Sequence, residues 1–304
     1  MGDVLAGIHS TWEFDTDSVL IRFERGIRTP KLLQVLGERR IPYEALSSVE
    51  LAPGKRRGTV VLHAVPRRGA DPLLDAAAGQ LREASDPYRL VLPAERETLA
   101  DYYAGELRSA LGPAAAEEAD DYLVPAPAAP LQFKAYDGKV SFDGKEVAFR
   151  WFWTGASSAK WKAGDQAFAV GDLEGVQWRS PEIAGGYLRL LRRGGAAAPR
   201  PGGHDRAEGD GDDEAGPAAD QDPAAVVFGL GYGLVHESLP LAAAVLEAIR
   251  AAEAADEGTR RHRSHRADPA DIAARIRHLG DLHSAGLLTD QEFTTKKTEL
   301  LAEL

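Results

Sequence analysis

Histidines and carboxylates are the side chains of this chain that could do chemistry, because it holds 8 histidines, 47 acidic residues and no cysteine. The lack of cysteine excludes disulfides, zinc–thiolate sites and cysteine nucleophiles. Zinc enzymes often pair histidines at helical spacing beside a carboxylate, whereas the histidines here are scattered. No serine lies in a Gly-x-Ser-x-Gly elbow, and no motif places a Ser/His/Asp set. We therefore expect no metal site, no cofactor and no catalysis.

A glycine-rich run, Gly229-Leu230-Gly231-Tyr232-Gly233, superficially resembles a phosphate-binding loop. It lacks the Gly-x-Gly-x-x-Gly spacing, and no strand–helix–strand pattern surrounds it. We interpret it as the end of a strand at a tight turn.

The main basic cluster combines Lys55, Arg56 and Arg57 with Arg67 and Arg68. Basic residues near an anionic membrane each contribute about 1 kcal/mol to binding, so one hypothesis is contact with an anionic surface. The alternative is that these residues form a solvated hairpin tip.

A dense aromatic cluster, Trp151, Phe152, Trp153 and Trp161, occurs in the second half of the chain. Phe152 breaks the alternation expected of a half-buried strand, so we expect one of these rings to face solvent. One interpretation is a contact patch for a partner or for the first half of the chain. The other is a core with a single exposed ring.

An internal repeat positions these residues. The matching segments are 12–23 with 140–151, 41–51 with 168–178, and 58–62 with 186–190. All three matches have an offset of 127 or 128 residues. Because this period is too long for a solenoid, the pattern indicates a duplicated domain.

Each copy reads as antiparallel strands followed by an amphipathic helix. Alternating apolar residues around short Asp-rich turns predict a first hairpin, and a second hairpin follows it. Leu99, Tyr103, Leu107 and Leu111 predict a helix over 95–111, and Leu241, Val245 and Ile249 predict one over 239–253. The expected fold class is α+β.

Composition changes suggest the boundaries. We expect a first repeat over 1–112, a Pro/Ala linker over 113–130, a second repeat over 131–254, an Arg-rich linker over 255–268 and a helical hairpin over 269–304. The second repeat carries an acidic insertion, 194–223, that lacks the apolar bulk to fold and is expected to be disordered. The four arginines of 260–266 have no interleaved aromatic residues and the net charge is −11, so we do not expect nucleic-acid binding.

The last 35 residues or so carry the clearest local signals. Gly286 suits a helix end, and Thr289 with Glu292 forms a capping box for the next helix. Two such short helices cannot form a core of useful size, so the hairpin needs a partner surface and we expect a homo-oligomer. The apolar residues of the expected interface are Ile272, Ile276, Leu279, Leu282, Phe293, Leu300 and Leu301.

Residues 272–304 resemble the SHOCT (short C-terminal) domain of bacterial proteins. The resemblance rests on the run from Leu279 to Phe293, with its Gly286-Leu287-Leu288-Thr289 turn, and on Lys296–Leu301. It implies an oligomerisation or interaction module.

The first 255 residues or so resemble an actinobacterial family of unknown function (domain of unknown function 4429), built from two pleckstrin-homology-like repeats. The paired Phe-Asp hairpins and the segment 41–50 carry this resemblance. It implies two tandem antiparallel β-barrel or roll domains, each a partly open seven-stranded barrel closed by a C-terminal helix. Phosphoinositide-binding members place Lys and Arg on the first hairpin loop. The loops here, 15–17 and 143–145, are short and mostly acidic, so we do not expect phosphoinositide recognition.

The sequence thus predicts a non-catalytic interaction or scaffold protein that binds a protein or peptide and self-associates through its hairpin. The alternative is a peripheral membrane or small-ligand-binding protein that uses the barrel surface. No apolar run reaches the roughly 18 residues of a membrane span, and no secretory signal is visible. We therefore expect a cytoplasmic location.

Overall fold

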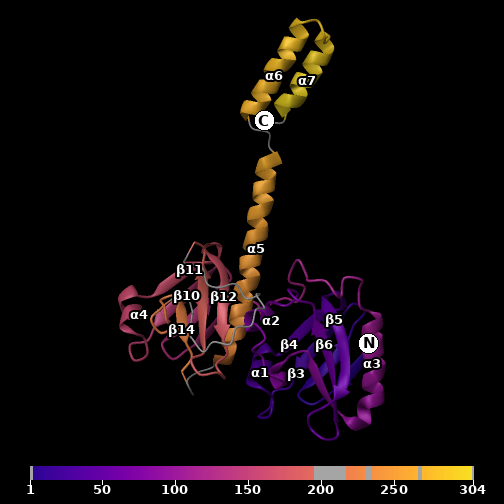
Figure 1. The fold of residues 1–304 in the computed structure, drawn as a ribbon, viewed down its shortest axis with the longest axis vertical. Helices are drawn as coiled ribbons and strands as arrows, with labels where there is room; N and C mark the ends of the chain where they lie inside the picture. Colours follow the sequence, from indigo (N-terminus) through magenta and orange to yellow (C-terminus); the bar gives the residue numbers. More distant parts are fainter. Residues whose placement is uncertain (1–2, 195–216, 230–234, 266–268, 303–304) are drawn as a thin grey trace, which may run out of the picture. The chain divides into compact units, whose positions relative to one another are not determined.

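The structure, a computed structural model, describes residues 3–194, 217–229, 235–265 and 269–302 (Figure 1). Only the backbone is described for 235, 258–265, 269–272 and 302. Most of the acidic insertion expected to be disordered, 195–216, lies outside the described residues. The chain divides into two compact units, Met1–Arg250 and Ala251–Leu304. The fold is α+β with antiparallel sheets, as the alternating sequence pattern predicts.

The first unit contains the same order of strands twice, each time followed by a closing helix. We call the first occurrence repeat 1, with two sheets ordered β1-β2-β3-β4 and β5-β6-β7. Its strands are β1 (Asp3–Ala6), β2 (Ser10–Phe14), β3 (Ser18–Phe23), β4 (Glu38–Pro42), β5 (Leu46–Pro53), β6 (Thr59–Pro66) and β7 (Arg89–Pro93). Its helices are α1 (Lys31–Leu36), η1 (Tyr43–Ala45), α2 (Pro72–Ala77), η2 (Glu83–Ser85), η3 (Ala94–Arg96) and α3 (Glu97–Ser109).

Repeat 2 follows the same plan, with sheets ordered β8-β9-β10-β11 and β12-β13-β14. Its strands are β8 (Leu131–Lys134), β9 (Gly138–Phe142), β10 (Glu146–Trp151), β11 (Gln166–Ala169), β12 (Leu173–Arg179), β13 (Tyr187–Arg192) and β14 (Ala225–Val227). Its helices are α4 (Ser158–Ala163), η4 (Val170–Asp172), η5 (Val235–Glu237) and α5 (Ser238–His265). The two predicted hairpins are present in both repeats, and the structure adds the short strands β1, β4, β8 and β11.

Equivalent hydrogen bonds join the two sheets in both repeats. The Ile8 amide donates to the Val91 carbonyl at 2.7 Å, and the Tyr136 amide donates to the Val227 carbonyl at 3.1 Å. The other junction is a 3₁₀ turn, η1 in repeat 1 and η4 in repeat 2. The duplication inferred from the sequence therefore extends to the contacts between sheets.

Each closing helix, α3 or α5, buries one face, but the buried residues of α3 differ in part from those predicted. In α5, Leu241, Val245 and Ile249 are buried as expected. In α3, Tyr103 and Leu107 are buried whereas Leu99 is 43% exposed. Ala100 and Ala104 complete the buried face instead, because small residues let the helix lie close to the sheet.

The segments expected to be linkers have structure of their own. Ala119 and Val124 belong to the core of repeat 1, and the amides of Leu123 and Val124 donate to the Ala70 carbonyl. The Pro/Ala segment therefore packs onto repeat 1. Helix α5 continues to His265, so most of the expected Arg-rich linker is helical.

The second unit contains the predicted helical hairpin, α6 (Pro269–Ser284) and α7 (Asp290–Ala302). Gly286 has φ +70°, the left-handed conformation expected at the end of α6. The Thr289 amide donates to Glu292 Oε2 at 3.0 Å, and the Glu292 amide donates to Thr289 Oγ1 at 3.4 Å. Both local predictions for this hairpin are confirmed.

Candidate functional site: a cleft between the repeats

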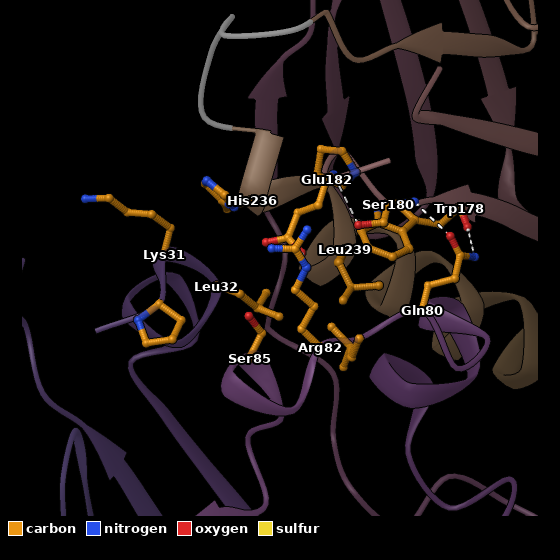
Figure 2. Close-up of a pocket in the computed structure, with 13 residues that line it drawn as sticks. Lys31, Leu32, Gln80, Arg82, Ser85, Trp178, Ser180, Glu182, His236 and Leu239 are labelled. Carbon is orange, nitrogen blue, oxygen red and sulfur yellow. Dashed lines mark hydrogen bonds and ion pairs between the residues drawn. The ribbon is translucent and has the colours of Figure 1, made fainter. Parts of the chain in front are cut away.

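A cleft of about 200 Å³ lies between repeat 1 and repeat 2 within the first unit (Figure 2). Repeat 1 contributes α1 and the segment after α2, and repeat 2 contributes the end of β12 and the start of α5. The lining residues are Pro30, Lys31, Leu32, Gln80, Leu81, Arg82, Ser85, Trp178, Ser180, Pro181, Glu182, His236 and Leu239.

Gln80 joins the two walls of the cleft through its side-chain amide. Its Nε2 donates to the Trp178 carbonyl at 2.8 Å, and its Oε1 accepts from the Ser180 amide at 2.9 Å. Both bonds are drawn as dashed lines in Figure 2. Because the amide satisfies a carbonyl and an N–H on the same strand end, it holds repeat 1 against repeat 2 at this point.

The floor of the cleft is apolar. Leu32, Trp178 and Leu239 are buried, and Leu81 is half-buried beside them. The Trp178 indole Nε1 donates to Ser238 Oγ at 2.9 Å, which fixes the ring against the first turn of α5. A rigid aromatic floor of this kind favours binding of an apolar group, because little side-chain freedom remains to be lost.

The rim of the cleft carries charges. Arg82 Nε lies 2.7 Å from Glu182 Oε2, and this exposed pair spans the two repeats. Lys31 is exposed, and Figure 2 shows its side chain extending away from the apolar residues. Burial lowers the pKa of His236 below its usual 6.5; Glu182 opposes this shift and Lys31 adds to it. Because Glu182 offsets the charge of Arg82, Lys31 gives the rim an excess of positive charge.

The size of the cleft indicates what it can hold. Pockets for drug-sized ligands usually have volumes of about 300–1,000 Å³, so 200 Å³ is small for such a molecule. One or two side chains of a partner would fit it. The lining therefore suits an apolar side chain on the Trp178 floor with an acidic group at the rim.

Comparison with known proteins yields one finding, which concerns the two repeats. A family model described as Domain of unknown function (DUF4429) matches residues 12–108 and residues 140–246, about two thirds of the chain. The chain belongs to this family. The two matches coincide with repeats 1 and 2, so the predicted duplication is confirmed. No curated protein matches the chain.

The basic residues that the sequence grouped together are separated in the first DUF4429 repeat. Lys55, Arg56 and Arg57 lie at the β5–β6 turn, whereas Arg67 and Arg68 follow the other end of β6, roughly 25 Å away along a strand. The Arg67 guanidinium donates to the carbonyls of Glu44, Glu117 and Glu118. Arg67 thus holds the 113–130 segment in place and is not part of a free basic patch.

At the β5–β6 turn, Lys55 Nζ lies 3.0 Å from Glu83 Oε2, and the Lys55 side chain is largely exposed. Arg56, Arg57 and Arg68 are exposed. Lys55, Arg56 and Arg57 thus form a solvent-exposed hairpin tip, whereas Arg68 lies at the other end of β6.

The aromatic residues of the second DUF4429 repeat divide into two groups. Trp151 is buried and Phe152 is half-buried, whereas Trp153 and Trp161 are 78% and 51% exposed. We predicted one exposed ring and the structure has two, because β10 ends at Trp151 and Trp161 lies on the outer face of α4.

The hairpin residues are only partly covered within their own unit. Leu300 is buried; Ile276, Leu279, Leu282 and Phe293 are half-buried, and Leu301 is 48% exposed. The side chain of Ile272 and most of the 229–233 glycine run lie outside the described residues.

The described residues contain no group of three or more His, Cys, Asp or Glu side chains that could hold a metal ion. In the same part of the chain, the helices are too short or too polar to cross a membrane.

Sequence reasoning missed the cleft, because its lining comes from four segments that lie far apart in the chain. Repeat 1 contributes Gln80, Arg82 and Ser85 from the segment between β6 and β7. The duplication itself was the signal that could have pointed to an interface, because two copies of one domain in one chain can pack against each other.

Proposed function

We propose that this DUF4429 protein is a non-catalytic binding protein that holds a segment of a partner protein in the cleft between its repeats. The observation that carries the proposal is a small apolar cleft, with Trp178 in its floor and Lys31 and Arg82 on its rim, built from both repeats. Fixed polar contacts on both sides, through Gln80 and Ser238, keep it preformed. An acidic segment with one bulky apolar residue is the occupant that matches this lining.

The test is selection of a displayed peptide library against the full chain. We expect acidic peptides with an aromatic or aliphatic residue to be enriched. Ser85→Trp fills the cleft from its wall and should weaken their binding by about tenfold or more, since the apolar anchor loses its site. Ser109→Trp, at an exposed position on α3, is the matched control. Failure to enrich any peptide, or equal binding by Ser85→Trp, would exclude the proposal.

We also propose that each repeat is a pleckstrin-homology-like domain. Support comes from the seven strands and the closing helix that the described residues of each repeat form. A crystal structure in which the two sheets of a repeat do not enclose one core would exclude this assignment.

The C-terminal hairpin, in this proposal a SHOCT-like module, drives self-association. Support comes from its small core: among its described side chains, only Leu300 is buried, and Leu287 is 71% exposed. Because so few side chains are buried, their hydrophobic free energy cannot offset the conformational entropy lost on ordering about 30 residues. Another surface must therefore cover the hairpin.

Measurement of the mass of the full chain in solution tests this second proposal. Leu287→Glu with Leu301→Glu should convert an oligomer into a monomer, because each charge would be placed in an apolar interface. Thr295→Glu, at an exposed position on α7, should leave the mass unchanged. A wild-type monomer at tens of micromolar would contradict the proposal.

A further inference from the structure

Trp153 and Trp161 form an exposed pair on repeat 2. Their ring centroids are 5.4 Å apart and the rings are nearly perpendicular, at 86°. The other tryptophans of the chain, Trp12, Trp151 and Trp178, are buried. In Figure 1, α4, which carries Trp161, lies at the edge of repeat 2 away from repeat 1. The pair is therefore separate from the inter-repeat cleft.

The geometry of the pair decides what kind of contact it can make. Rings in edge-to-face contact leave no slot between them, so neither a proline ring nor a methylammonium group can be held between their faces. The two rings together form one convex apolar surface. We name this surface, Trp153 with Trp161, the aromatic knob.

Asp137 positions both segments that carry the knob. Its carbonyl accepts from the Phe152 amide at 2.9 Å, directly before Trp153. Its carboxylate accepts from Lys160 Nζ, directly before Trp161, and from the Val227 amide at 3.0 Å. Lys160 and Asp137 are both buried, so α4 is held by an ion pair in the protein interior. The two segments that carry the knob are thus held to the same residue.

Repeat 1 has the backbone turn of this arrangement but none of its side chains. Its Glu24 amide also donates to a carbonyl, that of His9, so the backbone turn is the same. The positions equivalent to Trp153 and Trp161 are Arg25 and Gln34, and Leu33 stands where repeat 2 has Lys160. The knob and the ion pair that holds it are therefore features of one repeat and are not required by the fold.

Three cations form a row on the sheet whose strand β10 ends two residues before Trp153 of the knob. Lys134 pairs directly with Lys139, and Lys139 with Arg150, across β8, β9 and β10, so the three side chains share one face of the sheet. Arg150 Nε lies 3.6 Å from Asp165 Oδ2. Among the ion pairs between described residues, this is the one that gives the row an acidic partner. Like charges directly opposite each other destabilise a sheet. The equivalent positions of repeat 1 are Ala6, Thr11 and Arg22, and Arg22 is paired with Glu13 and Glu38.

We propose that the aromatic knob inserts into the interface of an anionic membrane, with the Lys134–Lys139–Arg150 row against the lipid headgroups. A convex indole pair suits a membrane interface, where one end of the ring is apolar and the other is wet. The cation row supplies the charge complementarity that a neutral partner would not require. Lys162, exposed on α4 beside Trp161, adds to it.

The test uses the full chain and vesicles of two parts phosphatidylcholine to one part phosphatidylserine. We expect the chain to cosediment with these vesicles at low salt, to dissociate as salt is added, and to bind pure phosphatidylcholine weakly. Brominated lipids should quench tryptophan fluorescence. Trp153→Ala with Trp161→Ala should lower the partition coefficient by about tenfold or more and remove the quenching, because the inserted rings are gone.

Two further variants separate the contributions. Lys134→Gln with Lys139→Gln and Arg150→Gln should lower partitioning by about tenfold or more and abolish most of its salt dependence. Tyr102→Ala removes an aromatic side chain that is 56% exposed on repeat 1, and should change nothing. Ser85→Trp, which blocks the cleft, should also leave vesicle binding intact.

Absence of cosedimentation at low salt would overturn the proposal. The knob would then be expected to bind a pocket on another protein. Quenching that persists without Trp153 and Trp161 would also overturn it. Melting temperatures of all variants confirm that the comparison is between folded proteins.

Discussion

Repeats 1 and 2 share their order of strands but bury their charges in different places. In repeat 1, Arg39 Nη2 lies 2.6 Å from Asp71 Oδ1, and the Tyr88 hydroxyl donates to the same carboxylate. Asp71 also caps α2 by accepting from the Leu73 amide at 2.8 Å. This cluster therefore attaches α2, which is followed by the segment that lines the cleft, to the sheet of repeat 1.

The electrostatics of the Arg39 cluster favour the ion pair. Burial raises the pKa of Tyr88 well above its usual value, and the charge of Asp71 raises it further. Burial by itself would lower the pKa of the Arg39 guanidinium. The interactions with Tyr88 and Asp71 outweigh this effect, so the pKa is raised. The Tyr88 phenol therefore stays neutral beside a charged Arg39 guanidinium at physiological pH.

In repeat 2 the buried pair is Lys160 with Asp137. Burial raises the pKa of Asp137 and lowers that of Lys160, against the attraction between the two charges. The Lys160 ammonium also lies 5.0 Å from the centroid of the Trp151 ring. The comparison shows that the two copies use a buried charge for different tasks: repeat 1 orders a wall of the cleft, and repeat 2 orders the segment that carries the aromatic knob.

Asp71→Ala should give the largest effect, because it leaves Arg39 buried without its partner and removes the cap of α2. We expect a loss of about 3–5 kcal/mol in the free energy of unfolding, measured by urea denaturation. Asp101→Ala, at an exposed position on α3, should change it by less than about 0.5 kcal/mol. A loss below about 1 kcal/mol would show that the cluster does not attach α2.

Lys160→Leu places the residue of repeat 1 into repeat 2 and leaves Asp137 buried and unpaired. We expect it to cost about 3 kcal/mol, and Asp137→Asn in addition should recover at least half of this, because no buried charge remains. A double-mutant cycle measures the coupling. Independent, additive effects would mean that the ion pair does not hold α4.

Arg250→Ala tests whether the closing helix of repeat 2 also stabilises repeat 1. Its guanidinium carbon lies 3.9 Å from the centroid of the Tyr122 ring, and its Nη1 donates to the Gly69 carbonyl at 3.2 Å. Loss of both contacts should cost about 1–2 kcal/mol. Arg57→Ala at the β5–β6 turn is the matched control. Equal stability of the two variants would argue that the repeats fold independently.

The smallest effect concerns His236, which lies in the cleft on the side of repeat 2. Its pKa in the folded protein is below 6.5, so below that pH the unfolded chain takes up the proton first. The stability that neutral His236 maintains is present above pH 6.5 and is lost as the pH falls toward the folded pKa. His236→Gln should flatten the profile as the pH falls below about 6.5, measured as the difference in unfolding free energy from wild type. Identical profiles would mean that His236 does not contribute.

Local patterns in the sequence were enough for several elements. Alternation of apolar residues predicted the paired hairpins, and helical spacing predicted α3 and α5. Capping residues predicted the turn between α6 and α7, where Thr289 and Glu292 form the expected bonds. These predictions succeeded because each depends on residues within a few positions of one another.

The remaining features depend on partners far along the chain. Strand β4, Glu38–Pro42, has a charged sequence that does not indicate a strand, and its Arg39 is buried only because Asp71 and Tyr88 reach it. Nothing in the sequence around Lys160 indicates that its side chain is buried. It is buried because it pairs with Asp137, which lies 23 residues earlier. The cleft, likewise, exists only where the two repeats meet.

The sequence by itself therefore determined that one domain occurs twice, in a register of 127 or 128 residues, and that a helical hairpin follows. Tertiary structure alone decided which charges are buried, which tryptophans are exposed and where the repeats form a cleft. The physical reason is that pattern and capping are local properties of the chain, whereas the burial of a side chain depends on which distant segments pack against it.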